Sequence, residues 1–309
     1  MAHESSLRCE HVKVLGVIGS ARKNGNCEIL VKEALIQAQH DGAEIKAIRL
    51  PDFHLLPCKG CLACVLKGEP CRLADDMHAL WSHFQWADGI ILSAPTYFLG
   101  PAGIIKLLID RLFEYSLQLG KIKQRPGAII ATAGLREWDP FTLPMLSMLA
   151  GILQLNLVDR FVAYRPGPGE VLLDNETMSR SKKIGAAIAH QIQHPSHTIQ
   201  LFTSTNACIQ CGTPFFKLLE NNQVECQLCQ AHGSLHQDGK NVTISWTDRV
   251  VKNRWSPEAL AEHFSEWVLR TGPVYQQHRE EIRKRIQQYQ DLAILPGPQR
   301  KKQQQELLD

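Results

Sequence analysis

Short apolar segments alternate with amphipathic ones through the first two thirds of the chain. Apolar runs of eight to ten residues are typical of buried strands, and apolar residues at helical spacing separate them. The predicted strands are 12–20, 43–50, 87–95, 127–134 and 155–164. The predicted helices are 27–42, 75–86, 101–116, 141–153 and 177–193.

This alternation predicts an α/β fold in which a parallel sheet is covered by helices. Five such strands fit a flavodoxin-like doubly wound five-stranded sheet with the order 2-1-3-4-5. Ligands of such sheets bind at the carboxyl ends of the strands. The loops that follow the strands are therefore the first place to look for a site.

The pattern changes after about residue 200. The stretch 208–229 is short, rich in turns and bracketed by pairs of cysteines, and the segment "ISWTDR" (244–249) after it suggests a distinct lobe. Helices are predicted at 256–272 and 273–293, before a polar tail at 295–309. We therefore expect a flavodoxin-like domain over 1–199 and a small metal-binding carboxyl-terminal lobe. Within that lobe, 200–245 is a zinc-ribbon-like module and 246–309 a helical segment with its tail.

Composition narrows the choice of partners and compartment. The 309 residues carry a net charge of +3 and a pI near 8.3, which disfavours a nucleic-acid partner. No apolar run reaches the roughly 18 to 20 residues that cross a bilayer, and the amino terminus lacks the pattern of a signal peptide. We expect a cytoplasmic protein with reduced thiols, so its ten cysteines favour metal or redox chemistry over disulfides.

The segment "GSARKNGN" (19–26) lies between the first strand and the first helix, where open α/β sheets bind phosphate. Its Gly, Ser and Asn residues permit a tight turn with inward backbone N–H groups, and the helix start adds partial positive charge. The candidate phosphate ligands are Ser20, Arg22, Asn24, Asn26 and Cys27. An ordinary strand-to-helix turn with a solvated Arg22 is the alternative.

The stretch "GVIGSARKNGNCEILVKEAL" resembles the opening of the NADPH-dependent FMN reductase superfamily. Residues 75–111 are similar to that family's third strand, flavin loop and following helix, and with the "TAG" segment the resemblance covers roughly 12–195. Ala21 replaces the usual Pro, and Cys27 replaces a Thr or Ser whose hydroxyl would contact phosphate. The resemblance implies a flavodoxin-like fold and bound FMN.

The resemblance also assigns the loops after the third and fourth strands to the flavin ring. Tyr97 and Phe98 would form an aromatic wall, while Thr96, Ala133 and Gly134 would present backbone groups. The full set of expected flavin contacts in these loops is Pro95, Thr96, Tyr97, Phe98, Thr132, Ala133 and Gly134. Alternatively, the two aromatic residues belong to the core or to an interface.

The compact run "CKGCLACVLKGEPC" has the spacing C-x2-C-x2-C-x6-C. It resembles the motif of the iron–sulfur flavoproteins, a branch of the same superfamily. That resemblance assigns Cys58, Cys61, Cys64 and Cys71 as ligands of one [4Fe–4S] cluster. Zinc is disfavoured because it prefers two separated knuckles. Reactive thiols and a set of free structural thiols are two rival interpretations of the run.

A second set has the spacing C-x2-C-x14-C-x2-C, close to that of a zinc ribbon. We expect Cys208, Cys211, Cys226 and Cys229 to bind a structural zinc ion. A single iron ion, as in rubredoxin, is the less favoured option because rubredoxins have a longer gap and a Cys-Pro knuckle.

These features favour an iron–sulfur flavoprotein oxidoreductase that passes electrons between a one-electron donor such as ferredoxin, a [4Fe–4S] cluster, FMN and a small acceptor. No acid–base residue of the protein is required, because the cofactors carry the chemistry. The resemblance further implies a homodimer or homotetramer. Two alternatives are an NAD(P)H-dependent FMN or quinone reductase and a redox-responsive protein that binds a macromolecule through its zinc ribbon.

Overall fold

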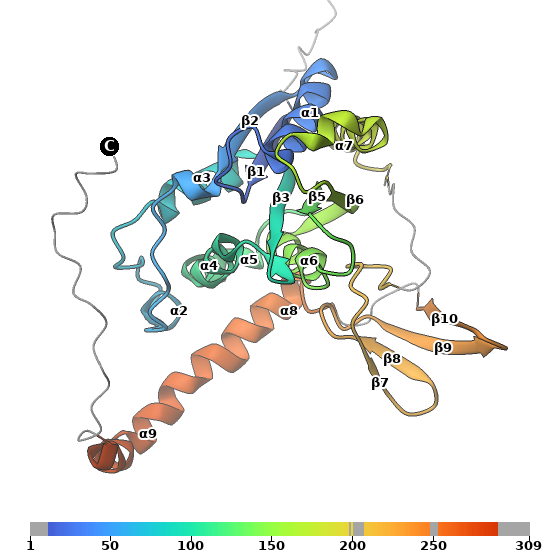
Figure 1. Ribbon diagram of the computed structural model, residues 1–309. Helices are drawn as coiled ribbons and strands as arrows, with labels where there is room; N and C mark the ends of the chain where they lie inside the picture. Colours follow the sequence, from blue (N-terminus) through green and yellow to red (C-terminus); the bar gives the residue numbers. More distant parts are fainter. Residues whose placement is uncertain (1–11, 198, 200–206, 248–252, 290–309) are drawn as a thin grey trace, which may run out of the picture.

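The computed structural model describes residues 12–197, 199, 207–247 and 253–289. Its centre is a parallel sheet with the order β2-β1-β3-β5-β6 (Figure 1). The strands are β1 (Lys13–Ile18), β2 (Glu44–Arg49), β3 (Gly89–Tyr97), β5 (Arg125–Ala133) and β6 (Leu155–Tyr164). This is the predicted order, and the flavodoxin-like fold is confirmed. The short strand β4 (Gly100–Pro101) pairs antiparallel with the end of β3.

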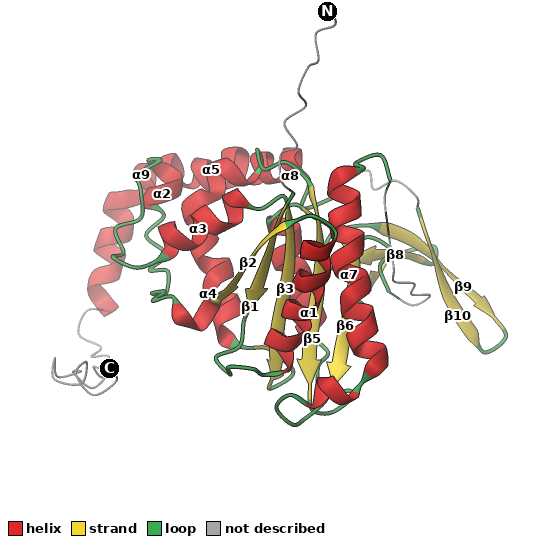
Figure 2. Ribbon diagram, turned by 90° about the horizontal axis from the view of Figure 1, so that it is seen from above, coloured by secondary structure: helices red, strands yellow, loops and turns green. Residues whose placement is uncertain are grey.

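Helices bury both faces of the sheet, and successive side chains of each strand point to opposite faces. Leu15 and Val17 pack into one hydrophobic cluster, and Val14 and Ile18 pack into the other. The first face is covered by α3 (Met77–Trp86), α4 (Gly103–Arg111) and α6 (Thr142–Ile152). The second face is covered by α1 (Asn26–His40) and α7 (Asn175–Gln193), which lie side by side in Figure 2.

The helix predicted at 101–116 is divided into α4, the 3-10 turn η2 (Leu112–Tyr115) and α5 (Ser116–Leu119). Leu112 and Tyr115 are both buried, and three-residue spacing in a 3-10 turn places them on one side. Other short elements are η1 (Leu50–Asp52), α2 (Ala63–Leu66) and η3 (Glu170–Leu173).

The carboxyl-terminal lobe begins with a four-stranded antiparallel sheet of order β10-β9-β8-β7. Its strands are β7 (Phe216–Leu218), β8 (Gln223–Cys226), β9 (His232–Asp238) and β10 (Asn241–Trp246). β10 contains the first three residues of the segment 244–249, of which residues 248 and 249 lie outside the described residues.

One helical rod follows, and it extends away from the body in Figure 1. It consists of α8 (Pro257–Glu262), the π-helical turn η4 (His263–Val268), α9 (Leu269–Ile286) and η5 (Gln287–Tyr289). The predicted break at Pro273 is wrong. The helix continues through Pro273 just after the π-helical turn, an irregularity that commonly accommodates a disturbed hydrogen-bond ladder. The predicted tail and Cys9 lie outside the described residues. None of the helices in the described ranges is long and apolar enough to cross a membrane.

The contact between α1 and α7 gives a test of this packing. A Cβ atom on Gly185 of α7 would collide with the backbone carbonyl of Ala34 in α1, whereas one on the exposed Gly103 of α4 meets nothing within 4 Å. We expect Gly185→Ala to lower the free energy of unfolding by about 1–3 kcal/mol through overpacking. Gly103→Ala should be neutral or stabilising by up to about 1 kcal/mol, because Ala favours helix. Equal losses in urea unfolding of the two variants would contradict the close helix contact.

Candidate functional site

The phosphate loop is a closed turn between β1 and α1. The Gly19 N–H donates to the Ser93 carbonyl at 2.6 Å, and the Ser20 hydroxyl accepts from the Arg22 N–H at 3.2 Å. Asn24 adopts a left-handed conformation with φ of 53°, which Asn tolerates better than most residues. The turn directs the amino terminus of α1 at a cavity that Gly25, Asn26 and Cys27 help to line. Backbone N–H groups and the helix dipole favour an anion there.

Glu28 in the first turn of α1 holds this loop in place. Its carboxylate accepts from the Asn24 N–H at 3.0 Å and from the Arg49 guanidinium at 2.8 Å. Burial alone would raise the pKa of Glu28, but the hydrogen bonds from Lys32, Arg49 and Asn24 lower it to about 2. The ionised form of Glu28 therefore stabilises the folded loop.

Asn26 joins the phosphate loop to the segment after β6. Its amide group donates to the carbonyls of Arg165 and Gly167 at 2.8 and 3.0 Å, and its carbonyl accepts from the Val171 N–H at 3.4 Å. The side chain is engaged with the protein, so a phosphate in this loop would rely on the backbone N–H groups, Ser20 and Arg22. The same hydrogen bonds hold the Arg165 segment beside the phosphate loop, so that Arg165 lines the same cavity. The sequence did not indicate Arg165 as a site residue.

A cavity of about 150 Å³ opens at the carboxyl edge of the sheet. Its walls contain every expected ligand from the three loops except Asn24 and Phe98, together with three residues not anticipated. The lining is Ser20, Arg22, Gly25, Asn26, Cys27, Pro95, Thr96, Tyr97, Thr132, Ala133, Gly134, Arg165 and Pro166. Among these lining residues there are two arginines and no carboxylate, a combination that suits a phosphate dianion.

Cys27 stands deep in this cavity, 2% exposed, with its Sγ 3.2 Å from the Thr132 hydroxyl. Burial raises the pKa of the Cys27 thiol above its usual value. The group is therefore a neutral thiol at pH 7, a weak hydrogen-bond donor in place of the family's hydroxyl.

A second cavity of about 200 Å³ adjoins the first and shares Thr96, Ala133 and Gly134 with it. Phe98 and Leu99 form its rim at the tip of the β3–β4 hairpin, both in left-handed conformation with φ of 47° and 71°. Bulky side chains there cost roughly 1–2 kcal/mol each. The Leu99 carbonyl accepts from the Phe141 N–H at 2.9 Å, which helps to hold the hairpin.

Large apolar side chains surround this second cavity and face outward. Phe98 is fully exposed, and the others are about half exposed or more. We call this set the aromatic rim: Tyr97, Phe98, Leu135, Trp138 and Phe141. A polar cavity at a helix amino terminus that leads to an apolar rim matches the two ends of FMN, its phosphate and its flat ring.

Of the four cysteines at 58–71, Cys64 lies in the short helix α2, and the other three lie in the irregular segments on either side of it. Gly60 and Leu62 are both left-handed, with φ of 64° and 54°, and they alternate with Cys58, Cys61 and Cys64. The Gly60 N–H donates to the Cys58 Sγ at 3.4 Å. Burial raises the pKa of the Cys64 thiol, and the nearby Cys71 and Cys58 thiols raise it further. Cys58 and Cys71 are therefore both within electrostatic reach of Cys64.

These sulfurs do not gather as ligands of one ion do. Among the described residues, one group of potential metal ligands has its ligand atoms within 4.8 Å of one another. It consists of Cys208, Cys211, Cys226 and Cys229. A cubane cluster carries its four irons at separate corners, so its thiolates stand further apart than the ligands of a single ion. A cluster would therefore accept a wider set of sulfurs than a zinc ion would.

A buried ion pair anchors this loop to α4. Arg111 and Asp75 form the pair, and each side chain is 2% exposed. Arg111 also donates to the Leu56 carbonyl at 3.0 Å and to Glu114 at 3.1 Å, and Glu114 accepts from the Cys71 N–H at 3.4 Å. Burial alone would raise the pKa of Asp75, but hydrogen bonds from Arg111 and two backbone N–H groups bring it below its usual value.

The helical rod covers the other side of the cysteine loop. Leu66 of α2 lies close to Gly272 of α9, and Phe113 makes an edge contact with Phe264 at 6.2 Å. α2 thus sits between the flavodoxin-like domain and the rod, which restricts the loop that carries Cys64.

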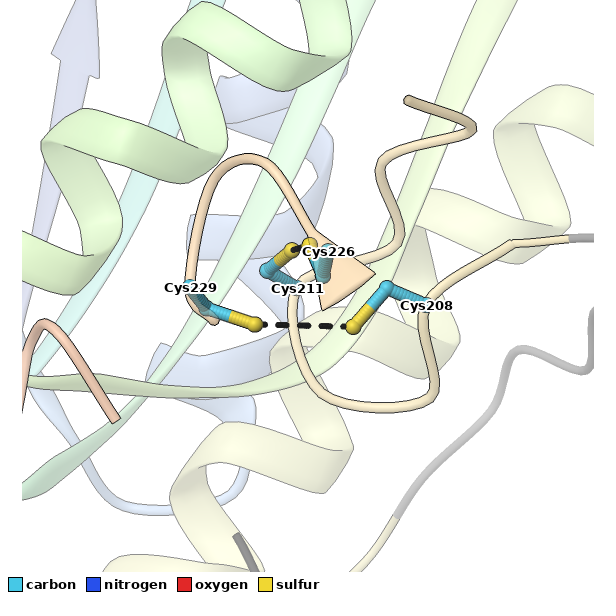
Figure 3. A group of neighbouring side chains, drawn as sticks. All are labelled: Cys208, Cys211, Cys226 and Cys229. Carbon is cyan, nitrogen blue, oxygen red and sulfur yellow. Dashed lines mark hydrogen bonds between the residues drawn. The ribbon is translucent and has the colours of Figure 1, made fainter. Parts of the chain in front are cut away.

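The second cysteine set converges on one place, as Figure 3 shows, and its four Sγ atoms all lie within 4.8 Å of one another. The Sγ atoms of Cys208 and Cys229 are 3.5 Å apart, and those of Cys211 and Cys226 are 3.4 Å apart. All four residues are buried, and hydrogen bonds from the other three thiols lower the pKa of Cys208.

The two halves of this site repeat one backbone design. In each half the residue after the second cysteine is left-handed, Gly212 with φ of 68° and Gln230 with φ of 65°. Its N–H donates to the carbonyl of the first cysteine, Cys208 at 2.8 Å or Cys226 at 2.9 Å. Two matching knuckles of this kind are typical of metal-binding ribbons.

The ribbon module is docked on the sheet domain. The buried Arg160 of β6 donates to the Cys208 carbonyl at 3.4 Å and packs under Gly212, which brings positive charge to the thiolates. Phe215 of the module meets Phe141 of the aromatic rim at 5.5 Å. The metal-binding module therefore supports one side of the aromatic rim.

Comparison with known proteins agrees with this geometry. Residues 12–164 match the model of the NADPH-dependent FMN reductase family. An iron–sulfur flavoprotein of Archaeoglobus fulgidus is 30% identical over 181 residues, which cover 57% of this chain and 89% of that protein. The chain belongs to the iron–sulfur flavoproteins of this family. It is an FMN-dependent oxidoreductase with an added metal-binding segment.

Two further relatives show how far the similarity extends. An iron–sulfur flavoprotein of Methanocaldococcus jannaschii is 37% identical over 127 residues, and the match covers 41% of this chain and 64% of that protein. A flavone synthase of Aspergillus candidus is 27% identical over 258 residues, covering 72% of this chain and 78% of that protein. A solved structure described as a flavone reductase shares the fold, with a TM-score of 0.73 and 21% identity over 93% of this chain and 100% of that chain.

The role of Glu28 gives a pH-dependent prediction. Because its pKa is lowered to about 2 from 4.5, its stabilisation is complete above pH 4.5 and is lost as the pH falls toward 2. We expect Glu28→Gln to lower the free energy of unfolding by about 2–3 kcal/mol at pH 7. The difference from the wild type should shrink by about 1 kcal/mol between pH 5 and pH 3.5.

Urea unfolding followed by fluorescence at several pH values measures this difference. Glu33→Gln on the same helix is the control, because Glu33 makes a surface pair with Lys182 that is worth about 1 kcal/mol or less. A deficit in Glu28→Gln that is small or independent of pH would contradict the role of this carboxylate.

Proposed function

We propose that Cys58, Cys61, Cys64 and Cys71 hold a [4Fe–4S] cluster and that the groove at the carboxyl edge of the sheet holds FMN. A cluster of this kind transfers single electrons, and a flavin transfers one or two. The cluster and the flavin together would therefore link one-electron transfer to two-electron transfer. A one-electron donor such as ferredoxin would deliver electrons at the cysteine loop. A small acceptor would be reduced at the aromatic rim.

The observation that carries this proposal is the rigid link between the two candidate sites. α4 begins where the Ala102 N–H donates to the Pro95 carbonyl in the flavin loop, at 3.0 Å. It ends at Arg111, which binds both ends of the cysteine loop through Leu56 and Asp75. Nine helical residues span about 13 Å, so one short helix fixes the separation of the two sites.

The surface around the cysteine loop suits an acidic electron carrier. Cys58 and Cys61 are exposed, and Lys59, Lys67 and Arg72 are exposed beside them. Glu69 pairs with two of these cations. The exposed lysines and arginine would hold an acidic donor by direct ion pairs that are sensitive to salt, while the cluster with its four thiolates carries negative charge of its own.

A cysteine substitution separates this function from simple flavin reduction. In Cys61→Ser we expect FMN to remain bound while reduction of the flavin by reduced ferredoxin slows by at least about tenfold, because the cluster loses a ligand. Anaerobic stopped-flow absorbance of the flavin measures the rate, and iron and sulfide content report the cluster.

Cys9→Ser is the matched control, because Cys9 belongs to neither cysteine motif. It should behave as the wild type. Unchanged ferredoxin-driven reduction in a Cys61→Ser protein that lacks iron would rule out the proposed electron route.

We further propose structural zinc for the Cys208 group. Four buried thiolates already complete a tetrahedral shell, which leaves no open position for a substrate. Docking through Arg160 and Phe215 gives the metal a structural part in shaping the flavin groove. The same packing disfavours a ribbon that acts as an independent macromolecule-binding module. We retain a homodimer or homotetramer as the proposed assembly.

A second candidate function is hydride exchange between NAD(P)H and a flat conjugated ketone at the FMN site. It is favoured by the exposed aromatic rim and by the flavone synthase relative, whose match covers 72% of this chain. Trp138 and Phe141, 63% and 47% exposed, offer faces on which a planar ring can stack.

Steady-state turnover of a flavone with NADPH tests this candidate. We expect Trp138→Ala to raise KM for the flavone about tenfold, the loss of one aromatic contact of about 1.4 kcal/mol. Tyr275→Ala, at an exposed tyrosine on α9, is the control and should leave KM unchanged. No turnover of flavone by the wild type with NADPH would eliminate the second candidate.

A further inference from the structure

Three histidines gather at the end of α7, far from both cysteine sets. His190 lies in the last turn of the helix, His194 is its carboxyl-terminal cap, and His197 follows one turn later. All three side chains are exposed. Their ring centres are 4.5 Å apart for His190 and His194, 6.0 Å for His190 and His197, and 6.1 Å for His194 and His197.

The backbone fixes this triangle. The His194 N–H donates to the His190 carbonyl at 2.8 Å, and the His197 N–H donates to the His194 carbonyl at 3.0 Å. Pro195 between them restricts the turn further. The three Cβ atoms are therefore held on one side of the helix end, and the side chains have only their own torsions to adjust.

The spacing agrees with three imidazoles on one ion. A metal–nitrogen bond of about 2.1 Å places an imidazole centre about 3.2 Å from the ion, so two imidazoles on a tetrahedral ion have centres about 5 Å apart. The observed separations lie on both sides of that value. The ring nitrogens are not gathered as closely as the Cys208 group, and rotation of exposed rings would complete the approach.

Two helix carboxyl termini meet beside the histidines. α1 and α7 end together, because the Gln193 side chain donates to the carbonyl of Asp41, the cap of α1, at 3.2 Å. Two helix carboxyl termini, each with partial negative charge, therefore point to the same region. The Asp41 carboxylate adds a formal negative charge nearby.

The histidines lie at the edge of the sheet opposite the flavin groove. Gln191, Ile192 and Pro195 line the same cavity as Asp88 and Arg125, which stand at the amino ends of β3 and β5. The phosphate loop, the aromatic rim and the cysteine loop follow the carboxyl ends of the strands. A ligand at the histidines is thus separate from the proposed redox site.

We propose that His190, His194 and His197 form a surface site for a divalent transition-metal ion of the borderline class, such as Zn²⁺ or Ni²⁺. Three neutral imidazole nitrogens are the donor set that such ions select, and water completes the coordination shell. The ion would fasten residues 194–197 to the end of α7, at the last turn of the flavodoxin-like domain. It acts as a structural clip and takes no part in electron transfer.

Nickel titration of the full-length protein by anaerobic calorimetry tests the site. The protein carries its zinc and iron, and both are quantified before and after the titration. We expect the wild type to take up one added Ni²⁺ per chain with a micromolar dissociation constant. The double variant His190→Gln/His194→Gln should bind at least about thirtyfold more weakly, because one imidazole remains. Nickel should raise the melting temperature of the wild type and leave that of the double variant unchanged.

His236→Gln/His278→Gln is the matched control, since both residues are exposed and lie on other elements. It should bind nickel as the wild type does. Equal binding by all three proteins would overturn the proposal. Uptake matched by release of zinc would also overturn it, because the ion would then occupy the cysteine site.

Discussion

The buried pair of Arg111 and Asp75 holds together the two parts of this protein that carry its chemistry. A guanidinium this deeply buried is stable only when its charge and its N–H groups are satisfied, and here a carboxylate and the Leu56 carbonyl satisfy them. The partners lie at the two ends of the cysteine loop, and Arg111 itself ends the helix that follows the flavin loop. Loss of Arg111 would leave the buried Asp75 carboxylate uncompensated, and loss of Asp75 would leave Arg111 paired with Glu114 alone; either change would weaken the attachment of the cysteine loop to the sheet domain.

The parallel sheet sets the second constraint. Because the strands run in one direction, every loop that follows a strand emerges at the same edge, and the phosphate loop, the two flavin loops and the Arg165 segment meet there. The ribbon module and the helical rod are additions to this edge. The module reaches the aromatic rim through Phe215, and the rod reaches α2 through Gly272. Both additions support a site whose core was already determined by the sheet.

Much of this architecture follows from local sequence. The apolar runs predict the strands that fit the observed sheet order, and the spacing of the second cysteine set predicts the four thiols that gather within reach of one ion. Arg165, the engagement of Asn26 and the pairing of Arg111 with Asp75 were not predictable, because each joins residues 36 to 141 positions apart. No local pattern encodes such contacts.

Two further differences have local causes that sequence reasoning weighed incorrectly. Two helices are predicted at 256–272 and 273–293, yet one helix runs through Pro273 just after a π-helical turn. Phe98 and Leu99 adopt a left-handed conformation that their side chains disfavour, since the tight hairpin between β3 and β4 requires it. Strain of this kind is common at functional sites, and here it lies on the rim of the flavin groove.

The most direct test is the composition and visible spectrum of protein purified without air. The account predicts flavin bands superposed on broad iron–sulfur absorption, with about four iron and four sulfide per FMN and about one zinc per chain. A protein with FMN but without iron and sulfide would contradict the cluster at Cys58, Cys61, Cys64 and Cys71, and with it the proposed transfer of electrons from a one-electron donor.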